Sequence, residues 1–107
     1  MRHINPPDLR AWLDDKTRSS PVVLDVREAW ELERAALTDV LWIPMREVPE
    51  RVSELDPSTE IVVVCHHGVR SFHIARFLER QGFVNVYNLS SGVEGWAQQV
   101  DPSMQTY

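Results

Sequence analysis

The feature that most constrains this chain is a run of four β-branched residues, Ile61 to Val64, which leads directly into the only cysteine. A strand with one solvent-facing side alternates apolar and polar residues, whereas a strand covered on both faces is apolar throughout. The run therefore predicts a central strand of a parallel sheet over residues 61–65. Cys65 then stands at the carboxyl end of that strand, before a short polar loop and a helix predicted over about residues 71–81.

Apolar runs alternate with helix-compatible stretches along the rest of the chain. Further strands are predicted over residues 2–4, 22–27, 40–43 and 84–89, and further helices after Asn5, over 28–36, over 45–55 and after Gly92. This alternation favours an α/β fold, an open parallel sheet with helices on both faces. We expect a single domain over residues 1–107, because this length suits one core and is short for two.

Composition narrows the classes of partner. Hydrophobic residues make up 43% of the chain and charged residues 25%, with no apolar run long enough for a membrane span or a secretory signal. The net charge of -5 disfavours nucleic acid and anionic membrane surfaces, so we expect neither as a partner. A single cysteine cannot form an internal disulfide, which favours a reducing, cytoplasmic location.

The position of Cys65 favours reactivity. Free backbone N–H groups of the loop and of the first helical turn converge at this point, and Gly68 lets the chain turn tightly around an anion. Such a setting stabilises a thiolate relative to the thiol and would make Cys65 a nucleophile. The alternative is that Cys65 is a small buried hydrophobic residue, as lone cysteines usually are.

Three segments together resemble one protein family. Asp25-Val26-Arg27-Glu28 ends one strand, Cys65-His66-His67-Gly68-Val69-Arg70-Ser71 follows another, and a closing segment runs from Gly82 to Trp96. Their order and spacing are similar to those of rhodanese-type sulfurtransferases, whose active-site loop has the pattern Cys-x-x-Gly-x-Arg followed by Ser or Thr. We call residues 65–71 the cysteine loop.

The resemblance implies a three-layer rhodanese-like fold with a five-stranded parallel sheet of order 3-2-4-5-1. It implies that Cys65 takes a sulfur from a small anionic donor such as thiosulfate, forming a persulfide, and passes it to a thiol or cyanide acceptor without a cofactor. His66, His67, Gly68, Val69, Arg70 and Ser71 would bind the persulfide and substrate, with Arg70 attracting the donor or bracing the loop. A persulfide carrier that exchanges sulfur with a relay protein is the alternative within this family.

Three other functions are less favoured. Cysteine-dependent phosphatases place five residues between cysteine and arginine, whereas four separate Cys65 from Arg70, which suits a sulfur atom better than phosphate. His66 and His67 beside one cysteine lack a usual metal-ligand spacing, so we expect no metal. A regulatory module without chemistry is disfavoured because the cysteine is present.

Asp25 and Arg27 are expected to support the cysteine loop or bind the donor, since they end a neighbouring strand; exposed surface ion pairs are the alternative. Two departures from the family pattern stand out. Residues 35–40 replace a usual Gly-His-Ile-Pro-Gly-Ala segment, which puts the shape of that loop in doubt, and Ser91 stands where a second glycine is usual. Ser91 is expected to be tolerated if its backbone torsions are ordinary.

Overall fold

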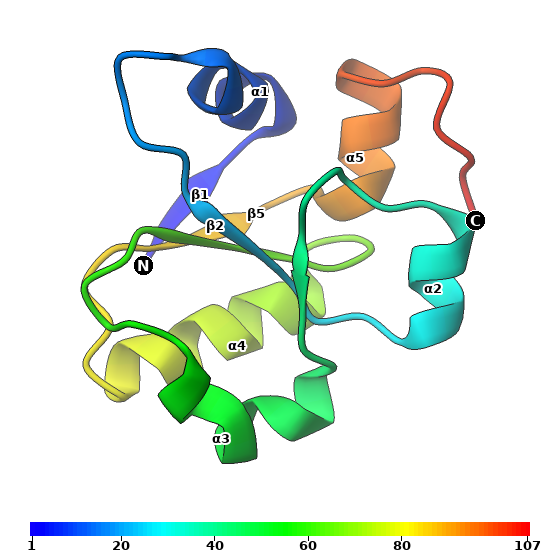
Figure 1. The fold of residues 1–107 in the computed structure, drawn as a ribbon. Coiled ribbons are helices and arrows are strands. Elements are labelled where there is room, and N and C mark those ends of the chain that lie inside the picture. Colours follow the sequence, from blue (N-terminus) through cyan, green and yellow to red (C-terminus); the bar gives the residue numbers. More distant parts are fainter.

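A computed structural model describes residues 1–107 (Figure 1). Five strands form one parallel sheet: β1 Arg2–Ile4, β2 Val22–Asp25, β3 Leu41–Trp42, β4 Ile61–Val64 and β5 Val86–Leu89. Their order is β1-β5-β4-β2-β3, which is the predicted order 3-2-4-5-1 read from the other edge. The prediction of fold and strand order is confirmed, and β4 lies at the centre of the sheet.

Helices cover both faces of the sheet. The helices are α1 Pro6–Asp14, α2 Ala29–Arg34, α3 Val48–Arg51, α4 Val69–Arg80 and α5 Gly92–Gln99, with 3-10 turns η1 Met45–Glu47 and η2 Val52–Glu54. Figure 1 shows α3 and α4 on one face, and α1 and α5 on the other. None of these helices combines the length and apolarity required to cross a bilayer.

The β-branched run of β4 is buried on both sides, as its sequence predicts. All four of its residues are at most 1% exposed. Ile61 and Val63 belong to one apolar cluster, whose α4 members are Ile74, Ala75 and Leu78. Val62 and Val64 belong to the other, with Leu9 and Trp12 of α1 and Val93 and Trp96 of α5. The two faces of β4 therefore join the two layers of helices.

Two predicted helices differ from those observed. The helix predicted over residues 45–55 is three short pieces, η1, α3 and η2. Pro49 lies in the first turn of α3, where it has no backbone N–H to donate to the preceding turn, and the backbone departs from helical torsions at Arg51, with φ -112° and ψ 8°. The helix after the cysteine begins at Val69, two residues earlier than predicted, because Gly68 takes a left-handed conformation with φ +99° and serves as its N-cap. Arg70 and Ser71 therefore lie in the first turn of α4.

Candidate active site

The sulfur of Cys65 lies where β4 ends and has two polar contacts. Gly68 N donates to Cys65 Sγ at 3.1 Å, and Ser71 Oγ lies 3.2 Å from the same sulfur. Cys65 is 1% exposed and also belongs to the apolar cluster on the α4 side. Cys65 is thus buried, as expected for a small hydrophobic residue. Its sulfur nevertheless has hydrogen-bond partners, as expected for a nucleophile.

Gly68 is required at its place for two reasons. Its φ of +99° is a conformation that residues with a Cβ rarely adopt. A Cβ atom at this position would also lie 2.2 Å from the carbonyl oxygen of Ser90. The backbone of Gly68 can therefore lie close to the segment after β5, which a side chain at this position would prevent.

Asn88 connects Ser71 to the loop backbone. The Ser71 hydroxyl donates to Asn88 Oδ1 at 2.5 Å, and Asn88 Nδ2 donates to the carbonyl oxygen of Gly68 at 3.1 Å. A hydroxyl carries one hydrogen, so Ser71 donates either to Asn88 or to Cys65 at any moment. A Cys65 thiol can donate to Ser71, whereas a thiolate or persulfide anion accepts from it. Sequence reasoning did not select Asn88, although a polar residue in a buried strand signals a hydrogen-bonded site.

Arg70 is held by a buried carboxylate. Its Nη1 and Nη2 donate to Glu31 Oε1 and Oε2 at 2.6 and 2.8 Å, and the Glu31 side chain is 4% exposed. This paired geometry raises the pKa of Arg70 further above its usual range. Of the two roles expected for Arg70, bracing the loop fits this contact, because the guanidinium is already paired. Sequence reasoning missed Glu31, since no pattern links α2 to the first turn of α4.

Asp25 and Arg27 form a buried pair rather than a surface pair. Both are 0% exposed, so the alternative of exposed surface ion pairs is wrong. Arg27 Nη2 and Nε donate to Asp25 Oδ2 at 2.7 and 3.1 Å, and Nη2 also donates to the carbonyl of Ala35 at 2.8 Å. The atypical 35–40 segment is thus tied to Arg27 by its backbone and packs Ala35 and Leu37 into the core.

His66 and His67 stack on each other with ring centroids 3.9 Å apart. Burial lowers the pKa of His66, and the neighbouring His67 lowers it further, against opposing effects of Glu31 and Glu94. The lowered pKa disfavours the charged form of His66. Within the structure, no three or more His, Cys, Asp or Glu side chains are grouped to hold a metal ion.

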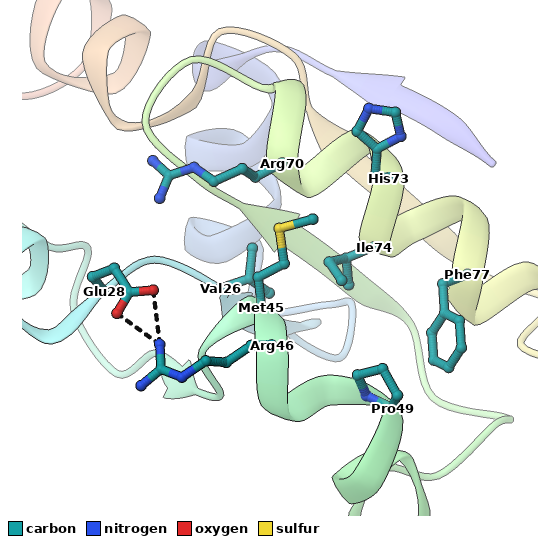
Figure 2. A pocket seen from close by; sticks show the side chains of 9 residues that line it. All are labelled: Val26, Glu28, Met45, Arg46, Pro49, Arg70, His73, Ile74 and Phe77. Carbon is teal, nitrogen blue, oxygen red and sulfur yellow. Dashed lines mark hydrogen bonds and ion pairs between the residues drawn. The ribbon is translucent and has the colours of Figure 1, made fainter.

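A groove of about 460 Å³ opens beside the cysteine loop, between α4 and the η1–α3 segment (Figure 2). Figure 2 shows Met45, Ile74 and Phe77 on its walls, with Arg46 bonded to Glu28 at its rim by contacts of 2.8 and 2.9 Å. Arg70 is the one residue of the cysteine loop among those lining it. The groove and the loop therefore meet at Arg70.

Glu31 gives the fold an acid-sensitive contribution that can be measured. Burial by itself raises its pKa, but hydrogen bonds from Arg70, the Glu28 N–H and Tyr107 outweigh burial and hold the pKa at about 2, below the ordinary 4.5. A depressed pKa stabilises the fold above pH 4.5, and this contribution is lost as the pH falls toward 2. The lowered pKa of Glu31 contributes on the order of 3 kcal/mol to the free energy of unfolding at neutral pH.

We expect Glu31→Gln to be less stable than the native chain at pH 7 and the difference to shrink steadily below pH 4.5. Urea unfolding at a series of pH values measures both quantities. Glu54→Gln is the matched control, because Glu54 pairs with Arg51 on the exposed surface and its pair is screened by solvent. A stability difference for Glu31→Gln that is the same at pH 7 and pH 3 would contradict this assignment.

Known proteins resemble the chain in both sequence and structure. The family described as "Rhodanese-like domain" matches residues 5–99. "Thiosulfate sulfurtransferase GlpE" of Coxiella burnetii is 34% identical over 88 residues, covering 82% of this chain and 81% of that protein. "Putative sulfur carrier protein YrkF" of Bacillus subtilis is 43% identical over 74 residues.

Some relatives are longer than this chain. The match covers 69% of this chain but 40% of YrkF, and a match to the chloroplastic "Rhodanese-like/PpiC domain-containing protein 12" of Arabidopsis thaliana covers 30% of that protein at 38% identity. Among solved structures, a rhodanese-like domain protein from Staphylococcus aureus superposes with a TM-score of 0.84 at 23% identity, over 100% of this chain and 99% of that one. This chain belongs to the rhodanese-like domain family.

Proposed function

We propose that this chain is a sulfurtransferase that moves a sulfane sulfur from a small anionic donor such as thiosulfate to a thiol or cyanide through a persulfide on Cys65. The observation that carries the proposal is the environment of the sulfur. Cys65 Sγ lies at the carboxyl end of the central strand, within 3.1 Å of Gly68 N and 3.2 Å of Ser71 Oγ. Membership of a family whose relatives include named sulfurtransferases supports it.

The reaction takes two displacements. The Cys65 thiolate attacks the outer sulfur of thiosulfate, a new S–S bond forms, and the bond to the inner sulfur breaks so that sulfite leaves with its electron pair. The acceptor then attacks the outer sulfur of the persulfide, and Cys65 leaves as a thiolate. With cyanide the product is thiocyanate. The two steps balance without an external oxidant, reductant or cofactor.

The cysteine loop supplies the groups that this chemistry needs. The Gly68 N–H donates to the sulfur, and the Ser71 hydroxyl can turn from Asn88 to donate to it when the sulfur is an anion. Donors placed in this way stabilise the charge of a persulfide anion. Arg70, held by Glu31, keeps the first turn of α4 in place. His66, His67 and Val69 are assigned to the rim of the site, and Asp25 with Arg27 to support from the end of β2. Four residues between Cys65 and Arg70 favour a single sulfur over a phosphate.

Thiocyanate production from thiosulfate and cyanide tests the proposal. Purified native chain is expected to catalyse it, with a rate proportional to protein concentration and lost after alkylation of Cys65. Absence of thiocyanate above the uncatalysed reaction, with either thiosulfate or an organic persulfide as donor, would contradict the enzymatic proposal.

A persulfide carrier is the second candidate, favoured by the likeness to YrkF, which is named a putative sulfur carrier. Cys65 is only 1% exposed, and this burial would shield a persulfide on Cys65 from solvent until a partner protein opens the loop. Exposure of the chain to a cysteine desulfurase and, separately, to thiosulfate distinguishes the two. A carrier acquires sulfur on Cys65 from the desulfurase alone, whereas the enzyme acquires it from thiosulfate as well.

A further inference from the structure

Tyr107 lies beyond the family match, which ends at residue 99, yet its side chain reaches the candidate site. The C-terminus lies beside α2 in Figure 1. The Tyr107 ring stacks on His66 with centroids 3.8 Å apart and planes 8° apart, and it meets the edge of Trp30 at 5.6 Å. A residue outside the span of the family match therefore contacts the cysteine loop directly.

The hydroxyl of Tyr107 joins two charged groups. Arg27 Nη1 donates to it at 2.8 Å, and it donates to Glu31 Oε2 at 2.8 Å. These two hydrogen bonds require a neutral phenol, because its hydroxyl hydrogen is donated to Glu31 while a lone pair of its oxygen accepts from Arg27. Burial raises the pKa of Tyr107 to about 12, so the phenol stays neutral under ordinary conditions. The same Glu31 oxygen accepts from Arg70 Nη2 at 2.8 Å.

We propose that Tyr107 is a positioning residue for the cysteine loop, acting through Glu31 on Arg70 and through its ring on His66. The contacts form a chain from the end of β2 to α4, in which Arg27 donates to Tyr107, Tyr107 to Glu31 and Arg70 to Glu31. Loss of the hydroxyl leaves Glu31 with one donor fewer and Arg70 less firmly held. The consequence for sulfur transfer rests on the proposed function, whereas the consequence for loop order does not.

Tyr107→Phe tests the hydroxyl and keeps the ring. We expect the rate at which thiosulfate adds sulfur to Cys65 to fall about 5- to 10-fold, as the typical net contribution of one hydrogen bond implies. Tyr87→Phe is the matched control, because the Tyr87 hydroxyl contacts Arg2 at the exposed edge of the sheet at 3.3 Å. The control is expected to load sulfur at the native rate.

A double-mutant cycle separates this role from a general contribution to stability. If Tyr107 acts through Glu31, adding Tyr107→Phe to Glu31→Gln slows sulfur loading no further than Glu31→Gln alone. Should Glu31→Gln fail to fold, Arg70→Gln replaces it with the same expectation, since the Arg70 side chain is 34% exposed and tolerates change more readily. Equal effects of Tyr107→Phe in both backgrounds would overturn the proposal.

Amide exchange provides a readout that does not depend on sulfur transfer. The Gly68 N–H, which donates to Cys65 Sγ, is expected to exchange about 5-fold faster in Tyr107→Phe, with the amides of β4 unchanged. Unchanged Gly68 exchange together with native loading would refute the role of Tyr107. If exchange responds but the native chain never acquires sulfur, the proposed function fails and the positioning role of Tyr107 stands.

Discussion

Replacement of Cys65 by alanine is expected to abolish sulfur transfer, with a loss of at least about 10³-fold in the rate of thiocyanate formation. The reason is that Cys65 is the only thiol in the chain, so no other residue can carry a persulfide. The remaining donors, the Gly68 N–H and the Ser71 hydroxyl, stabilise charge but cannot form the covalent intermediate.

Ser71→Ala gives the graded comparison for this prediction. It removes one contact to the sulfur and leaves the thiol, so its loss is expected to be about 10-fold rather than complete. Circular dichroism and thermal unfolding of both variants check that the fold is retained. A Cys65→Ala variant that forms thiocyanate at the native rate would contradict the assignment of Cys65 as the nucleophile.

Gly92→Ala is expected to cause a large loss of stability, about 3 to 5 kcal/mol in the free energy of unfolding. Gly92 has φ +62°, and a Cβ there would lie 2.3 Å from the carbonyl oxygen of His66 and 2.5 Å from that of Cys65. The next two residues donate to these same carbonyls, Val93 N to Cys65 at 2.9 Å and Glu94 N to His66 at 3.1 Å. The substitution therefore pushes the cysteine loop away from α5.

Gly82→Ala is the control for backbone strain alone. Gly82 has φ +97°, but a Cβ there would meet nothing within 4 Å. Gly82→Ala is therefore expected to lower the free energy of unfolding by only about 1 to 2 kcal/mol, the energy of placing a residue with a Cβ in the left-handed conformation. Urea unfolding of the two variants measures the contrast, and equal stabilities would show that the contact between α5 and the cysteine loop contributes little.

The residues that the sequence identified best are those governed by local pattern. Four consecutive β-branched residues require burial on both faces, and β4 is the central strand with helices on either side. Gly68 stands where the chain takes positive φ, and Ser91, with φ -104°, has ordinary backbone torsions. Each of these depends on interactions within a few residues or on the alternation of the sheet.

The residues that sequence reasoning missed depend on contacts between distant segments. Glu31 meets Arg70 and Tyr107 only because the fold brings α2, the start of α4 and the C-terminus together. The full burial of Asp25 and Arg27 likewise depends on Ala35 and Tyr107, which supply partners for the guanidinium. No spacing along the chain encodes these contacts, so they become visible only in three dimensions.

The mass of the peptide that contains Cys65, measured after the native chain is exposed to thiosulfate, tests the central claim most directly. One added sulfur is expected on this peptide, absent from Cys65→Ala and removed by cyanide with formation of thiocyanate. A Cys65 peptide that keeps its unmodified mass after exposure to thiosulfate, an organic persulfide and a desulfurase would contradict sulfur transfer through this residue.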